Sequence, residues 1–361
     1  MTAGARCMLM RGGTSRGAYF LAEDVPTDPA ERDEFLLRVM GTPDPRQIDG
    51  LGGATTVTSK VAIVSPSARD DVDVDYHFFQ VGVAEPTISD RQNCGNILAG
   101  VGPFAVERGL VSAGAERTEV RIRMVNTGGL VTAEFATPGG QVDYDGDTVL
   151  AGVPQSAAPI TLRFADLEGS VTGALLPTGQ LRDEIDGLTV TLIDNGMPAV
   201  IVAAGELGLT GHESHAELAA DEALLNRIDS LRIKAGELMG MGDVTALSVP
   251  KTAIVAPPAG DGMISVRSFI PRQPHQAIGV FGAISVVTGV LLDGAVGHEL
   301  AAAMPSGGGL IAVEHPSGVL QVDVRVDDSA DTPRVLSGGA VSTARKIFDG
   351  TVFPGPGQRL P

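Results

Sequence analysis

The sequence predicts an α+β protein made of two similar halves, each with β-structure wrapped around one central helix. The 47 glycines and 23 prolines in 361 residues indicate many turns and therefore numerous short strands. The strand segments alternate apolar and polar residues, whereas a doubly wound α/β sheet would show continuous apolar runs. Two segments, 94–111 and 278–292, are apolar nearly all round, as buried helices are, and they begin 184 residues apart (278 − 94).

The strand pattern recurs along the whole chain. Between 72 and 78, Val and aromatic residues fall on one face and Asp and His on the other, and Cys7 lies in an apparent N-terminal strand. Residues 119–135 alternate, turn at Asn126 to Gly129 and alternate again, which predicts a hairpin. Strands are also expected over 188–204, around an Asn-Gly turn, and over 319–326.

Fewer segments predict helices. Residues 27–41 have Thr27 as the expected N-cap, Pro29 in the first turn and Gly41 as the stop signal. Residues 212–240 have helical spacing over much of their length. The two buried helices each follow a strand pattern and open with a Gly-containing pair. We expect domains at 1–180 and 181–361 with the break near 175–187, a scheme that allows the C-terminal tail to return to the first domain.

Composition and charge exclude several classes of partner. A formal net charge of −18 repels nucleic acids and anionic membranes, and no tryptophan and only three tyrosines are available to stack on bases. A site for an anionic substrate must therefore be locally positive. The N-terminus lacks the apolar core of a signal peptide, no stretch of about 18 apolar residues occurs, and two cysteines make a poor disulfide framework. These features predict a cytoplasmic protein.

Cys94 precedes the first buried helix, in the segment "DRQNCGNILAGVGPF". The unpaired N–H groups of the first turn would lower the pKa of a thiol, Gly95 would let a carboxylate approach the backbone, and Asn96 could add an amide. The alternative is a buried cysteine acting as a small hydrophobe. The residues around Cys94 leave both open.

Lys60 lies in the apolar, β-branched segment "TTVTSKVAIVSP". A desolvated lysine favours its neutral amine, so its pKa would fall towards 7 to 8, as a general base requires. The alternative is a lysine on the solvent face of a strand.

Three further segments carry candidate ligand-binding groups. The loop in "MRGGTSRGAYF" brings Thr14, Ser15 and Arg16 together in a pattern that suits a carboxylate, although an ordinary turn would also produce it. The segment 267–279 places Arg272 and His275 before the second buried helix, and the turn 193–200 contains Asn195. The histidines show no metal-site spacing, so no metal is expected.

Seven motifs in order resemble those of the 2-methylaconitate isomerase (PrpF-like) family, within it most of all the 4-oxalomesaconate tautomerases, or 1,3-allylic isomerases. They are "LMRGGTSRGAYF", "DGLGGATTVTSKVAIV", "NCGNILAGVGPFAVERGLV", "DNGMPAV", "RSFIPRQPHQAIGVFGAISVVTG", "EHPSGVL" and "STARKIFDG". The resemblance implies the diaminopimelate-epimerase-like fold, with two domains that each enclose a helix and a site in the cleft. It also implies a role in bacterial breakdown of lignin-derived aromatics through gallate or protocatechuate 4,5-cleavage.

The resemblance further implies a cofactor-independent isomerase that moves a C=C bond in a small unsaturated keto-tricarboxylate. Lys60 would be the base, and Cys94 either a second acid/base or a pocket-lining residue. The position that matches Cys94 in the second half is Ile278, so a two-cysteine racemase is not expected. The implied substrate-binding residues are Thr14, Ser15, Arg16, Ser59, Gly95, Asn96, Asn195, Met197, Arg272, His275 and Gly279.

Two alternatives stay open. A 2-methylaconitate or aconitate cis–trans isomerase would use the same chemistry on a smaller substrate. A non-catalytic tricarboxylate-binding protein on the same scaffold would need no lysine at position 60. The sequence also leaves open whether the chain forms a homodimer.

Overall fold

A computed structural model describes residues 4–302, 304–327 and 333–356. The chain divides into two compact units: unit 1 comprises Met1–Leu162 with Ser342–Pro361, and unit 2 comprises Arg163–Val341. The division thus falls before the 175–187 segment, and the C-terminal segment groups with the N-terminal unit.

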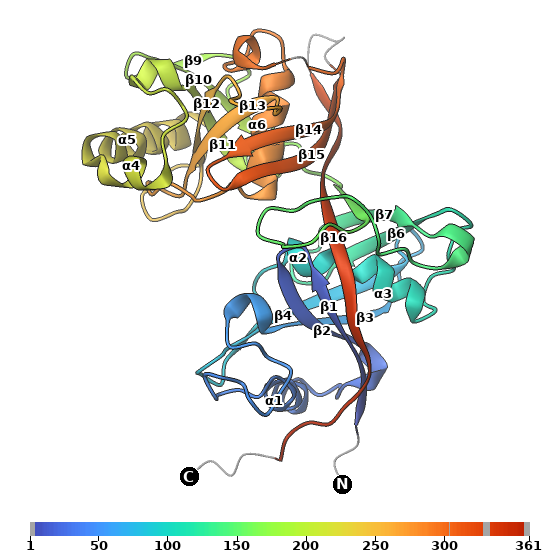
Figure 1. The fold of residues 1–361 in the computed structure, drawn as a ribbon. Coiled ribbons are helices and arrows are strands. Elements are labelled where there is room, and N and C mark those ends of the chain that lie inside the picture. Colours follow the sequence, from blue (N-terminus) through green and yellow to red (C-terminus); the bar gives the residue numbers. More distant parts are fainter. Residues whose placement is uncertain (1–3, 303, 328–332, 357–361) are drawn as a thin grey trace. The chain divides into compact units, whose positions relative to one another are not determined.

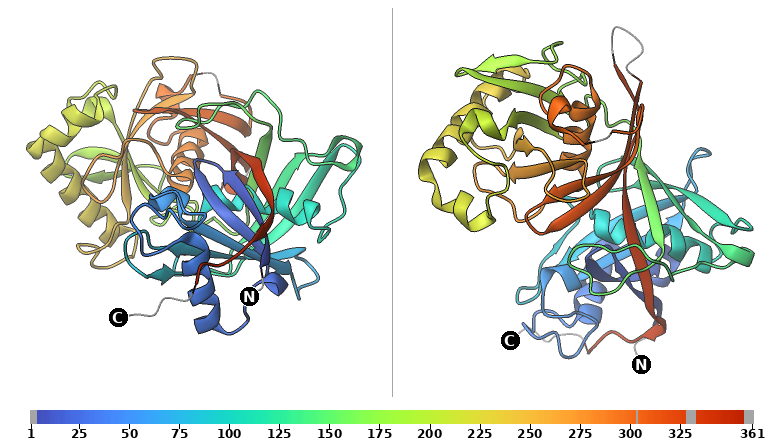
Figure 2. Two further views of the ribbon diagram at one scale, coloured as in Figure 1. Left: turned by 60° about the horizontal axis from the view of Figure 1, so that its bottom comes forward. Right: turned by 45° about the horizontal axis from the view of Figure 1, so that its top comes forward.

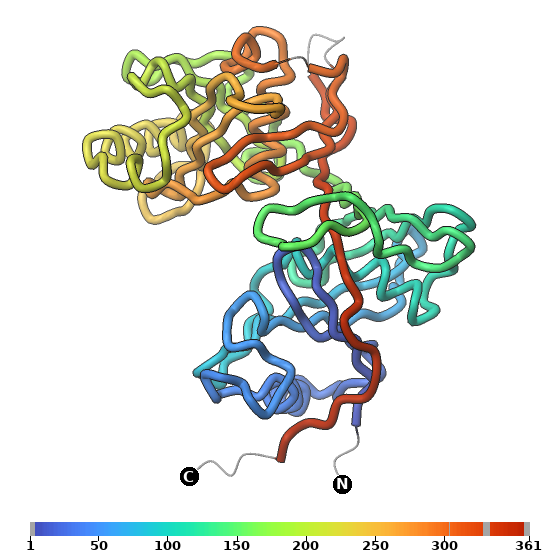
Figure 3. The backbone as a smooth tube through the Cα atoms, in the orientation of Figure 1, coloured from blue at the N-terminus to red at the C-terminus, as the bar shows by residue number. Residues whose placement is uncertain are grey.

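Unit 1 contains a closed ring of eight strands, most of which are labelled in Figure 1. Around the ring the order is β1, β2, β3, β4, β6, β7, β8 and β16, and the pairing of β16 with β1 closes it. The tube in Figure 3 shows the last strand lying alongside the first. The strands are β1 (Ala5–Gly12), β2 (Ser15–Leu21), β3 (Lys60–Pro66), β4 (Val74–Val81), β6 (Arg117–Met124), β7 (Leu130–Ala136), β8 (Pro159–Phe164) and β16 (Arg334–Val352), with β5 (Ile88–Ser89) paired to β4.

The helical segment of unit 1 contacts five strands of the ring. It is interrupted, forming α2 (Gly95–Leu98) and α3 (Val101–Glu107), where one helix over 94–111 was expected. Pro103 explains the interruption, because it has no N–H to donate to the Ala99 carbonyl. Both helices nevertheless contact β3, while α2 also contacts β1 and β2, and α3 contacts β6 and β7.

A second helix, α1 (Pro29–Met40), packs on the outward face of β1, β2, β3 and β4. Its Phe35, Leu36 and Val39 pack with Phe20 and Phe79. The predicted stop at Gly41 is confirmed, since this glycine has a φ of 78°. The predicted N-cap is wrong by one residue: Asp28, not Thr27, accepts hydrogen bonds from the first-turn N–H groups, because its carboxylate reaches two of them.

Unit 2 has a sheet with helices on both faces. Figure 2 shows α4 and α5 on one side of the strands, where they pack on one core, whereas α6 packs on the other. The strands run in the order β9 (Asp183–Ile185), β10 (Leu188–Asp194), β11 (Pro198–Ala203), β12 (Lys251–Ala256), β13 (Ile264–Phe269), β14 (Gly308–His315), β15 (Gly318–Asp327) and β16; the helices are α4 (His215–Ala220), α5 (Glu222–Leu238) and α6 (Val280–Leu291).

The helix expected over 212–240 is divided in two. Ser214 caps α4 in a capping box with Glu217, and Asp221 both ends α4 and caps α5 through the Leu224 N–H. A second cap within one periodic segment is the reason for the break. Short 3₁₀ helices complete the elements: Ala22–Asp24, Thr56–Thr58, Pro138–Gly140, Ala204–Leu207 and His298–Leu300.

The apolar helix expected over 278–292 is α6, with Gly279 as its N-cap. Its side chains fill the main core of unit 2, where each buried aliphatic side chain contributes about 1.5–3 kcal/mol. Within the described residues, no helix combines the length and the apolar character needed to cross a membrane.

Candidate active site

The turn between β1 and β2 is bound to the start of α2 by Asn96. Gly12 pairs with Ser15, so the hairpin loop is Gly13–Thr14, with Gly13 at a φ of 50°. Asn96 Oδ1 accepts from the Thr14 N–H at 3.3 Å, and its Nδ2 donates to the hydroxyls of Thr14 at 3.0 Å and Ser15 at 3.4 Å. The structure therefore brings together Thr14, Ser15, Asn96 and the Cys94–Gly95 turn.

Two buried tyrosines fix the first turn of α2. The Tyr19 hydroxyl donates to the Ile97 carbonyl at 2.5 Å, and the Tyr76 hydroxyl donates to the Cys94 carbonyl at 3.3 Å. Burial raises the pKa of both phenols well above the usual range, so they remain protonated donors. Cys94 itself is half-buried, and a Cβ on Gly95 would meet no atom within 4 Å. The two tyrosine hydroxyls thus hold the first turn in place, whereas the space beside Gly95 is open.

Lys60 is buried at the first position of β3, with 9% of its surface exposed, and does not lie on a solvent face. Its Nζ donates to Gln80 Oε1 at 2.7 Å. Gln80 Nε2 donates to three backbone carbonyls, of Thr56 and Ser59 at 3.0 Å and of Val81 at 3.3 Å. Because these carbonyls can only accept, the amide oxygen must face Lys60.

Lys60 and the Cys94 turn contact the same face of β4. Tyr76 and Phe78 are two residues apart on this strand and so project from one face. Tyr76 binds the Cys94 carbonyl, and Lys60 Nζ lies 5.1 Å from the centroid of the Phe78 ring. The amine and the thiol-bearing turn therefore lie against the same face of β4.

Ser59 and Arg16 have other surroundings. The Ser59 hydroxyl is fully buried, 2.8 Å from both Gln47 Oε1 and the Thr55 carbonyl. Arg16 alternates with Ser15 and Gly17 along β2, and its Nη2 contacts the Leu51 carbonyl at 3.5 Å. These contacts place Arg16 on the strand face opposite Ser15.

Cys7 is fully buried in β1, and burial raises the pKa of its thiol to about 12. It therefore stays a neutral thiol, while Cys94 is the more accessible of the two cysteines.

In unit 2, the loop joining β10 and β11 contacts the middle of α6. Asn195 is fully buried, and its Nδ2 donates to Thr288 Oγ1 at 2.7 Å. The Met197 carbonyl accepts from the Ser285 hydroxyl at 2.7 Å, while the Met197 residue stays half-buried. Asn195 thus fixes α6 to this loop through its side chain.

The candidate residues in the segment before α6 each have different neighbours. Arg272 forms an ion pair with Glu222 at 2.7 Å, at the start of α5. His275 is exposed, and its Nδ1 accepts from the Ala277 N–H at 2.9 Å. Around Gly279 the nearest neighbour of an added Cβ would be Lys251 Nζ, at 3.9 Å.

Sequence analysis missed two residues that the structure brings to these places: Gln80, which binds Lys60, and Lys251, beside Gly279. For Gln80 no local signal exists, because its pairing with Lys60 depends on the register of β3 against β4. For Lys251 a signal exists in the repeated motif described below. Within the described residues, no group of three or more His, Cys, Asp or Glu side chains could hold a metal ion.

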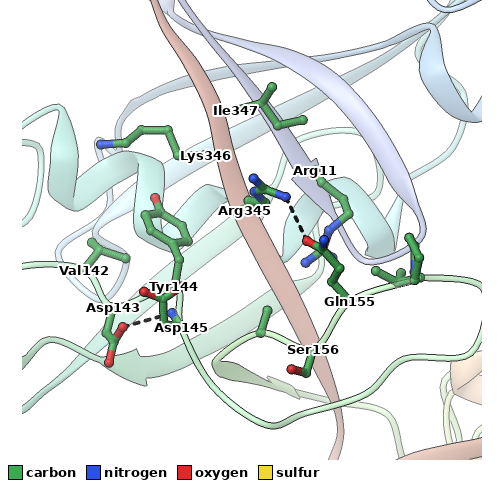
Figure 4. A pocket seen from close by; sticks show the side chains of 13 residues that line it. Arg11, Val142, Asp143, Tyr144, Asp145, Gln155, Ser156, Arg345, Lys346 and Ile347 are labelled. Atoms are coloured by element: carbon green, nitrogen blue, oxygen red, sulfur yellow. Dashed lines mark hydrogen bonds between the residues drawn. The ribbon is translucent and has the colours of Figure 1, made fainter.

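A pocket of about 550 Å³ lies on unit 1 (Figure 4). None of the predicted site residues lines it. Arg11 and Arg345, direct cross-strand partners, line it, and Arg345 donates to Gln155 at 3.2 Å. Arg11 also donates to the Gly13 carbonyl at 2.8 Å and to Thr343 Oγ1 at 2.9 Å. Arg11 therefore supports the β1–β2 turn from behind.

Comparisons with known proteins cover nearly the whole chain. The family described as PrpF protein matches residues 3–354. The (4E)-oxalomesaconate Delta-isomerase of Novosphingobium sp. (strain KA1) is 52% identical over 349 residues, which is 97% of either chain. The 4-oxalomesaconate tautomerase of Pseudomonas putida (strain KT2440) is 51% identical over 350 residues, covering 97% of this chain and 96% of that one.

Solved structures give the fold. The crystal structure of a methylitaconate-delta-isomerase superposes with a TM-score of 0.88 at 31% identity, covering 97% of this chain and 95% of that one. A protein described as a probable proline racemase, from Agrobacterium radiobacter K84, matches with a TM-score of 0.50 at 14% identity, covering 97% and 93%. Together they show the diaminopimelate-epimerase-like fold.

Proposed function

Because the chain belongs to the PrpF family, we propose that this isomerase moves a C=C bond of 4-oxalomesaconate by a 1,3-allylic proton transfer. The observation that carries the proposal is the buried Lys60, which Gln80 holds on the strand face that also binds the Cys94 turn. A buried amine beside a half-buried thiol suits proton transfer at carbon.

Lys60 is the proposed base. Its amine removes a proton from one end of a three-carbon allylic unit, and the electron pair spreads as a dienolate into carbonyl or carboxylate oxygens. A proton returned to the other end moves the double bond, and the product has the same atoms as the substrate. Lys60 can return this proton when both carbons lie on the same side; otherwise Cys94 is the proposed donor.

The open first turn of α2 is the proposed carboxylate-binding surface in unit 1. Gly95 leaves its backbone accessible, and Asn96 positions the hydroxyls of Thr14 and Ser15 beside it. Backbone N–H groups there would stabilise charge on the dienolate. Ser59 and Arg16 contribute indirectly in this scheme, since their polar groups bind the loop before β3.

In unit 2, Gly279, Met197, His275 and Arg272 are proposed substrate contacts. Arg272 would first have to leave Glu222. For Asn195 the proposed part is support of the loop that carries Met197, because its amide donates to α6.

The test is turnover of 4-oxalomesaconate in deuterated water, followed by ultraviolet absorbance and proton NMR. We expect the wild type to move the double bond with solvent deuterium entering the product, and Lys60→Met to lose at least a thousandfold in kcat. The matched control is Lys346→Met, which removes an exposed lysine paired with Glu107 and should keep wild-type activity. Cys94→Ala distinguishes an acid/base from a pocket-lining thiol by the size of its loss.

Other outcomes decide between the alternatives. Turnover of 2-methylaconitate or 3-methylitaconate instead of 4-oxalomesaconate would keep the mechanism and change the substrate. Binding of these di- and tricarboxylates without any turnover would indicate a non-catalytic binding protein. Full activity of Lys60→Met would refute the assignment of the base.

We also propose that both units are related domains of the same epimerase-like type. The support is their parallel construction: each has a β-hairpin, a parallel strand that begins at a lysine, and a helix with a glycine at its first position or its N-cap. A cytoplasmic location, a homodimer and a place in aromatic catabolism remain predictions from the sequence.

A further inference from the structure

A short motif occurs once in each unit and begins with lysine. Residues 60–66 read KVAIVSP and residues 251–257 read KTAIVAP, so five of seven positions are identical. The first copy forms β3 and the second forms β12, and each strand begins at its lysine. Lys60 and Lys251 are therefore counterparts in sequence.

The two lysines are also counterparts in topology. In unit 1, β3 runs parallel to the second strand of a hairpin, with Gly17 opposite Lys60. In unit 2, β12 runs parallel to the second strand of the β10–β11 hairpin, with Ala199 opposite Lys251. In each unit, the lysine is thus the first residue of the strand that lies parallel to the second strand of the hairpin.

Lys251 differs from the other lysines in its partners. The chain has four lysines. Lys234 and Lys346 are exposed and form ion pairs with Asp186 and Glu107, and Lys60 binds Gln80. Lys251 is half-buried and has no hydrogen-bond or ion-pair partner within the part of the chain that the structure describes.

The surroundings of Lys251 favour an anion. Its Nζ lies 3.9 Å from the position of a Cβ on Gly279, the N-cap of α6, whose 12 residues direct the positive end of the helix dipole to this place. Burial lowers the pKa of the Lys251 amine, and within the described residues no acidic side chain pairs with it. The chain has a net charge of −18, yet this ammonium has no acidic partner in the described ranges. Beside the N-terminus of a helix it can therefore bind an anion.

We propose that Lys251 forms a carboxylate-binding subsite in unit 2, which holds one carboxylate of the substrate beside Gly279. This inference rests on the proposed function for the identity of the substrate. Lys251 binds and does not take the proton, because it lacks an acceptor such as Gln80 to orient its amine, whereas an ammonium next to Gly279 can bind an oxyanion directly.

The experiment compares Lys251→Met, Lys251→Arg and Lys234→Met, the last removing an exposed lysine of the same unit. With 4-oxalomesaconate we expect Lys251→Met to raise KM at least tenfold while kcat falls by less than tenfold. Lys251→Arg should restore most of the affinity, and Lys234→Met should match the wild type. A KM for Lys251→Met within twofold of the wild-type value would overturn the proposal.

A second measurement needs no turnover. Tricarballylate, an unreactive tricarboxylate, should raise the Tm of the wild type and of Lys60→Met but not that of Lys251→Met. An equal Tm increase in Lys251→Met, or none in the wild type at millimolar concentration, would refute the subsite. If the wild type binds tricarballylate through Lys251 but isomerises none of the substrates, the proposed function fails and the subsite stands.

Discussion

Gln80 determines which way the Lys60 amine points. Its Nε2 group is committed to three backbone carbonyls, so the side chain cannot rotate without losing them. The remaining oxygen fixes Nζ at 2.7 Å, above the Phe78 ring. The hydrogen bond to Gln80 holds the amine in one position and orientation. Proton transfer by the neutral amine depends on this orientation. Under the proposed mechanism, Gln80 would therefore be a positioning residue.

Replacing Gln80 should alter catalysis through Lys60. Gln80→Leu removes the hydrogen bond to Lys60, worth about 1.5–3 kcal/mol when the amine is charged, together with the three carbonyl contacts. We expect kcat to fall about 10- to 100-fold with a smaller change in KM. Gln80→Glu places a carboxylate beside Lys60 and stabilises its ammonium form. We therefore expect the pH at which kcat rises to move upward by about one unit or more.

The pH–rate profile separates positioning from simple structural damage. If Gln80→Glu lowered kcat equally at every pH, with an unshifted profile, Gln80 would not act through Lys60. The Tm of each variant controls for the loss of the three carbonyl contacts.

At the scale of elements, the β1–β2 hairpin and the first turn of α2 form one small assembly. Gly12 and Gly13 let the strand backbone approach Asn96: a Cβ at Gly12 would lie 2.3 Å from the Asn96 carbonyl oxygen. Asn96 then binds Thr14 and Ser15, while Tyr19 binds Ile97. The glycines of this hairpin thus serve packing, whereas Gly95 faces open space.

Two alanine substitutions should separate these roles. Gly12→Ala forces the hairpin away from α2, and we expect a loss of about 1–3 kcal/mol and a Tm lower by several degrees. Gly95→Ala meets no atom, so we expect its stability to stay within about 0.5 kcal/mol. Yet its methyl group would occupy the surface proposed for the carboxylate, and kcat/KM should fall at least tenfold.

Thermal unfolding and steady-state kinetics on both variants check this pair. Wild-type kcat/KM in Gly95→Ala would show that the substrate does not approach the first turn of α2.

Local patterns predicted most elements but not the contacts between them. Alternation placed β4 and the β6–β7 hairpin, and the apolar segments placed α3 and α6, because these signals depend on neighbours in sequence. Pro103 and Asp221 divide helices that periodicity alone joins. For the site, the GGTS loop, Lys60 and Cys94 stood out by composition, whereas Gln80 needed the strand register. Neither the pairing of Arg272 with Glu222 nor the face of Arg16 follows from local sequence.

At the scale of the whole molecule, β16 belongs to both units. Its first part pairs with β15 in unit 2, from Arg334 to Ala340, and its later part pairs with β1 in unit 1, from Ala344 to Val352. The closed ring of unit 1 therefore contains a strand that is more than 170 residues away in sequence from its neighbour β8.

A chain that ends after Val341 should lose the ring of unit 1 but keep unit 2. Without the later part of β16, β1 and β8 each have an unpaired edge, and the buried β1 residues Cys7, Met8 and Met10 lose their neighbouring strand. We expect limited proteolysis with mass spectrometry to show rapid cleavage within 4–162 and protection of 163–341. Equal protection of both segments would show that unit 1 folds without this strand.

The shared strand also imposes an order of events on a nascent polypeptide. As the ribosome synthesises the chain from its amino end, the seven N-terminal strands of the ring emerge early, but their closing partner is translated only after all of unit 2. Unit 2 can complete its sheet up to β15 before β16 is synthesised. During that time β1 and β8 of unit 1 each have an unpaired edge. The candidate base Lys60 and its Gln80 partner therefore belong to a ring that becomes complete only near the end of translation, so completion of unit 1 depends on prior synthesis of unit 2.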